Sequence, residues 1–186
     1  MTTVLVVETD DVILLGADRQ YSWGSMSREG TKIVQKAPNF IFAGAGQGST
    51  IKCFENFNLP SKKESESDSQ YLFKVFDAFK DYCKELNNII VDKNVVYNQS
   101  SGIVVYNYKK YLLSSDFIVY EIMEDRTCLG SGGDFALGYL EDREVTKDNI
   151  IKAIQCSIKY DRGSGLGVDG IEQLKPKNNN IIKKRK

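Results

Sequence analysis

Thr2 follows Met1, so removal of the methionine would leave a hydroxyl group and a free α-amine on the same residue. An α-amine titrates near about 7.7–8.0, and Thr2 would then supply both a nucleophile and a base near neutral pH. A small second residue also favours removal of the initiator methionine. The sequence contains no histidine, which excludes Ser-His-Asp and Cys-His triads, His-ligated zinc and proton transfer by imidazole. Any hydrolysis by this chain must therefore use another base, and the amine of Thr2 is one.

The composition is that of a folded chain. Of its 186 residues, 41% are apolar and 27% charged, and only three are proline. These values predict one compact domain or at most two, and they exclude disordered, collagen-like and low-complexity classes for the body of the chain. The 25 basic and 25 acidic residues balance. The net charge therefore gives no reason to expect a nucleic acid or an anionic membrane as partner.

Basic residues gather at the end of the chain, where no acidic residue accompanies them: Lys175, Lys177, Lys183, Lys184, Arg185 and Lys186. We expect residues 1–174 to form a single domain and residues 175–186 to form a basic, disordered tail. A nuclear-import-like cluster, a nucleic-acid contact and a docking tail for a partner are the alternatives for this segment.

The cysteines and the apolar runs indicate the cellular compartment of the protein. Cys53, Cys83, Cys128 and Cys156 lack the CxxC spacing of zinc or redox sites and are expected to be small buried residues in a reducing environment. No apolar run reaches the roughly 20 residues of a membrane helix, and the first residues do not have the pattern of a signal peptide. We therefore expect a cytoplasmic protein without a metal site, with the nucleus as an alternative because of the basic tail.

Apolar runs separated by polar turns predict a β-rich start to the chain. Residues 4–7 and 12–15 are expected to form a hairpin, and residues 32–34 and 40–43 a second strand pair. The polar stretch between them shows no strand pattern. Further strands are expected at 102–108, 111–113, 117–122 and 168–174.

Helical spacing of apolar residues predicts four helices. The first runs through residues 51–57 with Ser49 or Thr50 as its cap, and the second through 69–86 with Asp68 or Ser69 as its cap. Two more follow the glycines at 130–133, the last of them capped by Thr146. The order of sheet, two helices, sheet, two helices and strand predicts helices stacked on a two-sheet sandwich within one domain.

Several short motifs follow one another along most of the chain. They are Thr2-Thr3-Val4, Gly16-Ala17-Asp18-Arg19, Lys32-Ile33, Phe42-Ala43-Gly44-Ala45-Gly46, Gly130-Ser131-Gly132-Gly133 and Asp161-Arg162-Gly163-Ser164-Gly165. Together they resemble the proteasome β-subunit family, including its HslV-type peptidases, over residues 2–174. The resemblance implies an α+β fold, a four-layer α-β-β-α sandwich of two antiparallel sheets, as in N-terminal-nucleophile hydrolases.

The resemblance also implies roles for individual residues. Thr2 matches the N-terminal nucleophile, Asp18 and Lys32 match the catalytic carboxylate and lysine, and Gly46 matches the glycine whose N–H forms the oxyanion hole. A nearby lysine would lower the pKa of the threonine hydroxyl, and the aspartate would orient that lysine. The residues that match the family's supporting polar groups are Ser131, Asp161 and Ser164. For Ser131, helix capping is an equal alternative.

The resemblance places the first specificity pocket at Gln20, Gly44 and Gly48, which predicts a roomy pocket without a committed charge. The chain departs from the family pattern at Gly48-Ser49-Thr50, where an aspartate is usual. Capping of the helix by a hydroxyl is expected to replace an ion pair there. The loop between Ser22 and Gly30 is also shorter than usual.

The motifs thus imply a threonine-type endopeptidase that needs no cofactor and acts on unfolded polypeptides. The family forms stacked rings of six or seven subunits, so the resemblance implies a homo-oligomeric ring and an ATP-dependent AAA+ unfoldase or regulatory ring as partner. Neither a membrane nor a nucleic acid is expected as partner. Two alternatives stay open: a non-catalytic structural or gating subunit of the same fold, and an amidohydrolase or peptide ligase that uses the same nucleophile.

Overall fold

The computed structural model describes residues 2–23, 25–92 and 95–176. Its first sheet has four antiparallel strands in the order β12-β1-β2-β13. Their bounds are Arg126–Leu129 for β12, Val4–Glu8 for β1, Val12–Asp18 for β2 and Val168–Leu174 for β13. The predicted N-terminal hairpin and the predicted last strand are therefore confirmed.

The second sheet has five antiparallel strands in the order β11-β10-β9-β6-β5. Their bounds are Val119–Glu121 for β11, Lys109–Leu113 for β10, Ser100–Tyr106 for β9, Phe40–Gly46 for β6 and Ile33–Ala37 for β5. The strand pair predicted near residues 32–43 forms the β5–β6 edge of this sheet.

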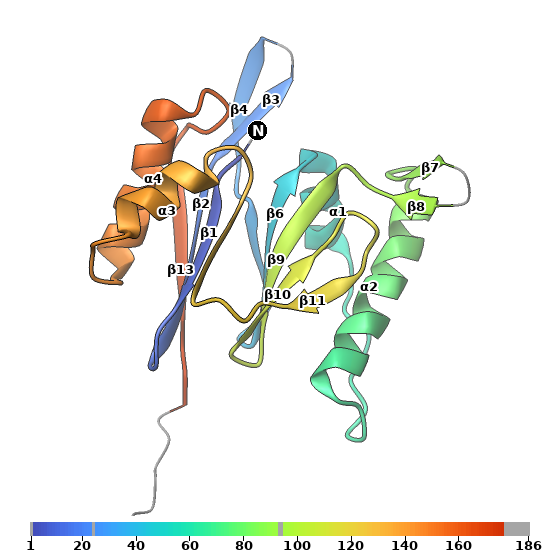
Figure 1. Ribbon diagram of the computed structural model, residues 1–186. Coiled ribbons are helices and arrows are strands. Elements are labelled where there is room, and N and C mark those ends of the chain that lie inside the picture. Colours follow the sequence, from blue (N-terminus) through green and yellow to red (C-terminus); the bar gives the residue numbers. More distant parts are fainter. Residues whose placement is uncertain (1, 24, 93–94, 177–186) are drawn as a thin grey trace, which may run out of the picture.

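Four helices form the two outer layers (Figure 1). The bounds are Gly48–Asn56 for α1, Asp68–Glu85 for α2, Gly133–Leu140 for α3 and Lys147–Tyr160 for α4. Figure 1 shows α1 and α2 beside the five-stranded sheet, and α3 and α4 beside the four-stranded sheet. The fold is thus the predicted α+β sandwich with layers in the order α-β-β-α.

The burial of β1 explains why its sequence is a continuous apolar run. Val4 and Val6 belong to the core between the two sheets, whereas Leu5 and Val7 belong to the core beneath α3 and α4. Successive side chains of a strand point to opposite faces, so a strand covered on both faces needs apolar residues at every position. The third core, rich in aromatic residues such as Phe54 and Phe76, lies under α1 and α2.

Two short hairpins and one strand were not predicted. The hairpins are β3 (Gln20–Trp23) with β4 (Met26–Glu29), and β7 (Ile90–Asp92) with β8 (Val95–Tyr97). Strand β12 is the third omission. The residues of β4 are all exposed, so they have no buried face that would impose an apolar alternation on the sequence.

The predicted helix caps were correct for α4 and wrong for α1 and α2. Thr146 caps α4 by accepting a hydrogen bond from the Asn149 N–H. Helix α1 begins after Gln47 without a side-chain cap, and the expected Thr50 hydroxyl bonds instead to Ser100 Oγ at 3.1 Å. Helix α2 begins after Ser67, one residue before the first expected cap, because Ser67 and Gln70 form a reciprocal capping box.

Glu8 at the end of β1 ties the two sheets together. Its carboxylate pairs with Lys110 of β10 at 2.5 Å and with Lys175, just after β13, at 2.6 Å. Lys110 is 1% exposed, so its ammonium depends on this carboxylate for compensation. Lys175, the first residue of the predicted tail, is thus held against the domain. Residues 177–186 of the predicted tail lie outside the described residues.

The Glu8→Gln variant is expected to be less stable than the wild type by about 3–5 kcal/mol at pH 7, because it leaves the buried Lys110 ammonium without an anion. Burial raises the pKa of Glu8, but Lys110 and Lys175 lower it further, to below its ordinary value. The contribution of the Glu8 carboxylate to the free energy of unfolding is therefore complete above about pH 4.3. It is lost as the pH falls through the lowered pKa of Glu8. Urea unfolding between pH 7 and pH 3 measures this.

The Glu8→Gln/Lys110→Met double variant is the control, because it removes both charges. We expect it to be more stable than Glu8→Gln alone and to lose less stability in acid than the wild type. Equal acid dependence in the wild type and the double variant would show that Glu8 makes no such contribution.

Candidate active site

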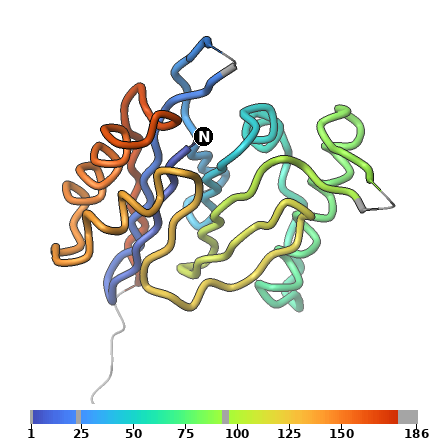
Figure 2. The backbone as a smooth tube through the Cα atoms, turned by 45° about the horizontal axis from the view of Figure 1, so that its top comes forward, coloured from blue at the N-terminus to red at the C-terminus, as the bar shows by residue number. Residues whose placement is uncertain are grey.

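Thr2, Asp18 and Lys32 meet at one end of the sandwich, between the two sheets. Thr2 precedes β1, Asp18 ends β2 and Lys32 precedes β5. Figure 2 shows the start of β1 at the end of the molecule where α1 begins. Lys32 Nζ donates hydrogen bonds to Thr2 Oγ1 at 2.9 Å and to Asp18 Oδ1 at 2.8 Å. All three are buried, with exposures of 2% for Thr2, 0% for Asp18 and 1% for Lys32.

The register of the first hairpin places Asp18 beside the start of β1. Val4 pairs with Ala17, and the next residues outward exchange two bonds: Asp18 N–H donates to the Thr3 carbonyl at 3.1 Å, and Thr3 N–H donates to Asp18 Oδ1 at 2.8 Å. The other carboxylate oxygen, Oδ2, accepts from the N–H groups of Gln20 and Gly165, each at 3.0 Å. Four donors therefore fix the orientation of the Asp18 carboxylate.

Lys32 places its ammonium group at the site from the five-stranded sheet, whose strand β5 it precedes. Its carbonyl accepts from Gly44 N–H at 3.0 Å, which anchors the backbone against β6. The Tyr21 ring centroid lies 5.5 Å from Lys32 Nζ, within the range of a cation–π contact. Burial lowers the pKa of Lys32 below its ordinary value, although Asp18 acts in the opposite direction. Lys32 therefore accepts and releases a proton closer to neutral pH than an exposed lysine does.

Asp161 is the centre of a second polar cluster. It lies at the C-terminal end of α4, where Ser131 Oγ and Ser164 Oγ donate to its Oδ2 at 2.9 and 2.7 Å. Burial raises the pKa of Asp161, but the bonds from Ser164, Ser131 and the Gly163 backbone outweigh it and lower the pKa below its ordinary value. The carboxylate is thus ionised at neutral pH. Ser131 does not cap α3, whose N-cap is Gly132 without a side-chain bond.

Two glycines allow the backbone to pass close to the site. Gly46 has φ +119°, and a Cβ added there would lie 2.2 Å from the Gln99 carbonyl oxygen. Gly130 has φ +86°, and its added Cβ would lie 2.0 Å from the Thr2 carbonyl oxygen. Both values of φ favour glycine, and both contacts exclude a larger residue.

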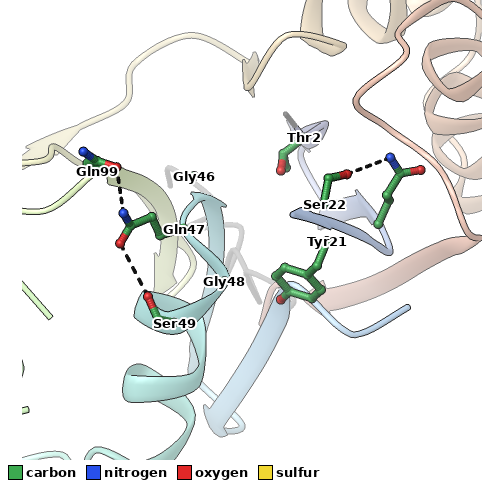
Figure 3. A pocket seen from close by; sticks show the side chains of 9 residues that line it. Thr2, Tyr21, Ser22, Gly46, Gln47, Gly48, Ser49 and Gln99 are labelled. Carbon is green, nitrogen blue, oxygen red and sulfur yellow. Dashed lines mark hydrogen bonds between the residues drawn. The ribbon is translucent and has the colours of Figure 1, made fainter. Parts of the chain in front are cut away.

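Two cavities adjoin Thr2 and Gly46. The first, of about 510 Å³, is also lined by Gln20, Tyr21, Ser22, Gln47, Gly48, Ser49 and Gln99 (Figure 3). The second, of about 500 Å³, is also lined by Ala45, Tyr97, Asn98, Gln99, Ser100, Ser101, Ser115, Leu129 and Gly130. Among the described residues, neither lining contains a charged side chain. Figure 3 shows Tyr21 and Gln47 on opposite walls of the first cavity.

The structure brings together nine of the ten residues that the sequence assigned to the site. Gln20 and Gly48 line the first cavity, whereas Gly44 lines neither of the two cavities. A Cβ added to Gly44 would lie 2.6 Å from an Ile51 side-chain carbon of α1. The alternation of β6 places Gly44 on the same face as Phe42, which packs beneath the helices.

Other residues at the site were missed by the sequence analysis. Tyr21 and Ser22 belong to the unpredicted β3–β4 hairpin, and Gln99 reaches Gln47 through the pairing of β6 with β9. Thr3 and Ser157 contact the Asp161 cluster through their hydroxyl groups. Ser157 did leave a signal, because it is a serine on the apolar face of an amphipathic helix.

Within the described residues, no group of three or more His, Cys, Asp or Glu side chains is placed to hold a metal ion. Among the helices of the described part of the chain, none is both long and apolar enough to span a membrane.

Comparisons with known proteins agree on the fold. No family model matches the sequence. A curated relative, proteasome subunit beta of Nanoarchaeum equitans, is 25% identical over 198 residues, which cover 94% of this chain and 97% of the relative. The structure of Thiobacillus denitrificans BPH in complex with epoxomicin matches with a TM-score of 0.76 and 17% identity, covering 94% of this chain and all (100%) of that one.

A eukaryotic HslV from Trypanosoma brucei also matches, with a TM-score of 0.61 and 19% identity over 91% of this chain and 98% of that chain. These solved structures show the fold, and the curated relative extends the likeness over nearly the whole sequence. The chain is therefore similar in sequence to a proteasome β-subunit and similar in fold to an HslV.

Proposed function

We propose that the chain is a threonine-type endopeptidase subunit of a self-compartmentalising ring protease, with Thr2 as the nucleophile after removal of Met1. The observation that carries the proposal is the buried contact of Thr2 Oγ1 with Lys32 Nζ, which Asp18 orients. A lysine held on a threonine hydroxyl at 2.9 Å is placed to assist its deprotonation. Gly46 and two cavities lie beside the same hydroxyl.

The chemistry begins when Thr2 Oγ attacks a peptide carbonyl carbon and forms a C–O bond. The hydroxyl proton passes to the Thr2 amine or to Lys32, whose lowered pKa favours this exchange. The carbonyl oxygen gains the negative charge, and the N–H of Gly46 would stabilise it. Breaking of the C–N bond releases the amine product with the transferred proton. Water then hydrolyses the ester and restores the Thr2 hydroxyl.

The Asp161 cluster would support these steps from the side of α4. Its ionised carboxylate can attract the positive charge that develops on the Thr2 amine, and Ser131 is exposed enough to meet an incoming water. Lys32 and Asp161 also attract each other. The three supporting residues Ser131, Asp161 and Ser164 therefore act on the amine and the water rather than on the attacking oxygen.

The two cavities suggest how a polypeptide would lie. Because Thr2 and Gly46 line both, an extended chain crossing Thr2 would place side chains on either side of the cleaved bond in different cavities. In the first cavity, the Tyr21 ring packs against Gly48, where an added Cβ would come within 2.6 Å of it. The uncharged linings suit uncharged side chains, because a buried charge would find no partner there.

Assembly and partners follow from the relatives. A ring of six or seven copies would enclose Thr2 in a chamber, and only unfolded polypeptides would enter. An ATP-dependent AAA+ unfoldase would then supply them. The names of two relatives, a proteasome subunit beta and an HslV, support a ring of this kind. The chemistry proposed for Thr2 requires no cofactor.

The test is intact-mass analysis of the assembled protein before and after treatment with a peptide epoxyketone. We expect loss of Met1 and one adduct per chain, because the epoxyketone requires both the hydroxyl and the amine of Thr2. The Thr2→Ala variant should form no adduct. The Thr9→Ala variant is the matched control, since Thr9 lies at the far end of β1 in the turn before Val12, and it should be labelled normally.

Two results would contradict the proposal. Retention of Met1 without any adduct would favour the non-catalytic ring subunit, because the base and the nucleophile would both be blocked. A monomeric particle in solution would exclude the chamber.

A further inference from the structure

A row of buried hydroxyl groups extends from Asp161 into α4. Ser164 Oγ lies 2.7 Å from Asp161 Oδ2, and Thr3 Oγ1 lies 2.7 Å from Ser164 Oγ. Ser157 Oγ of α4 lies 2.8 Å from Thr3 Oγ1 and 2.7 Å from the Ile154 carbonyl oxygen. Thr3 and Ser157 are fully buried, so water cannot replace the bond between their hydroxyl groups.

If every contact between these side chains is a hydrogen bond, counting protons gives the row two arrangements. Each hydroxyl has one proton to donate, so Ser157 can serve either Thr3 or the Ile154 carbonyl, but not both. When Asp161 is ionised it only accepts, and Ser164 must donate to it. Thr3 then donates to Ser164, and Ser157 donates to Thr3. The opposite order requires a protonated Asp161 and ends at the Ile154 carbonyl. The charge on Asp161 therefore sets the direction of the whole row.

Thr3 also connects this row to the other half of the site. Its N–H donates to Asp18 Oδ1 at 2.8 Å, and its carbonyl accepts from Asp18 N–H at 3.1 Å. Asp18 in turn orients Lys32. Thr3 is thus the neighbour of the nucleophile along the chain and contacts both carboxylate clusters of the site.

Ser157 and Thr3 lie beside apolar residues. Ser157 lies on the buried face of α4 with Ile150, Ala153 and Ile154, and Thr3 precedes the apolar run of β1. Replacing both partners of a buried hydrogen bond by apolar groups of similar shape is often neutral for stability. Stability alone therefore does not account for this pair of hydroxyls, whereas orientation of Ser164 does.

We propose that Thr3 and Ser157 are positioning residues: they orient Ser164 toward Asp161, and through it they hold the polar cluster that faces Thr2. The inference rests on the proposed function of Thr2 and adds two residues outside the nucleophile, lysine and carboxylate set.

The test compares Thr3→Val, Thr3→Ser and Ser157→Ala with the wild-type assembly. In Thr3→Val, which keeps the shape but lacks the hydroxyl, kcat for a fluorogenic peptide is expected to fall about tenfold with little change in KM. The acid limb of the kcat profile should move to higher pH, because Ser164 supports ionised Asp161 less well. Thr3→Ser should restore both quantities. Ser157→Ala should change kcat and the acid limb in the same direction as Thr3→Val but to a smaller extent, because Thr3 still donates to Ser164.

The matched control is Ile150→Val, on the same face of α4 but outside the row. It should lower the melting temperature and leave the acid limb in place, as a merely structural change does. Lys32 and the N-terminal amine, whose positive charges act on Asp161, are unchanged in every variant.

A carbon-13 NMR titration of the Asp161 carboxyl separates this inference from the proposed function. A pKa of Asp161 that is equal in the wild type and Thr3→Val overturns the inference, whether or not the chain cleaves peptides. A higher pKa in Thr3→Val supports the row of hydroxyls, and if the wild type were inactive, that result would count against the peptidase function alone.

Discussion

Replacing Lys32 by methionine is expected to reduce kcat/KM for peptide cleavage by about a thousandfold and to abolish rapid labelling of Thr2. Methionine fills the space of the lysine stem, but it cannot donate to Thr2 Oγ1 or exchange its proton. Positioned proton transfer contributes typically about 10²–10⁴-fold to a rate. The measurement is the rate of fluorogenic peptide cleavage together with the rate of epoxyketone adduct formation.

Lys36→Met is the control for this change. Lys36 belongs to β5, the strand that begins immediately after Lys32. Its Nζ donates to the Glu55 carbonyl of α1 rather than to the site. Its rate should stay within about twofold of the wild type, as expected for a group without contact to the reacting atoms. A Lys32→Met protein whose rate also stays within about twofold of the wild type would exclude Lys32 from the mechanism.

Replacing Asp18 by asparagine is expected to lower the free energy of unfolding by about 3–5 kcal/mol, because it leaves the buried Lys32 ammonium without its anion. The amide is also a poorer acceptor for the backbone N–H groups that now meet a carboxylate. Urea unfolding at fixed protein concentration measures the change, so that any contribution from self-association stays the same.

The double variant Asp18→Asn/Lys32→Met shows whether the buried charge is the cause. It should be more stable than Asp18→Asn, because no unpaired cation is then buried. Asp169→Asn is the surface control: this aspartate pairs with Arg19 at a partly exposed position, and its loss should cost about 1 kcal/mol or less. If Asp18→Asn cost no more than this control, the pair with Lys32 would not be the source of stability.

Much of the sandwich could be predicted because its strands and helices have buried faces. The apolar residues of β1 and β2 and the spacing along α2 and α4 follow directly from the layers they contact. The β3–β4 hairpin was missed for the opposite reason, since its second strand is exposed on both faces. Hydroxyl caps were placed wrongly at α1 because Thr50 bonds across to β9 rather than to its own helix.

The site was predicted from the order of its motifs. The errors arose at residues whose place in the site depends on contacts between distant parts of the chain. Gly44 was assigned to the pocket from the family resemblance, but it packs against Ile51 of α1, whereas Gly46 lies against Gln99 and Ser100 and lines the cavity. Gln99 reaches the cavity through the β6–β9 register, in which Gly46 pairs with Ser100. A single sequence does not reveal the pairing of strands that are so far apart.

The position of β1 has a consequence for the motions available to Thr2. This strand lies between β12 and β2, and its side chains enter two separate cores. Amide protons at such a place exchange with solvent only when the whole domain opens, whereas loops and edge strands open by themselves. The threonine at its start is therefore attached to a part of the backbone that we expect to exchange slowly. Under the proposed function, the cavity walls could open locally to bind a polypeptide while the Thr2 hydroxyl keeps its position.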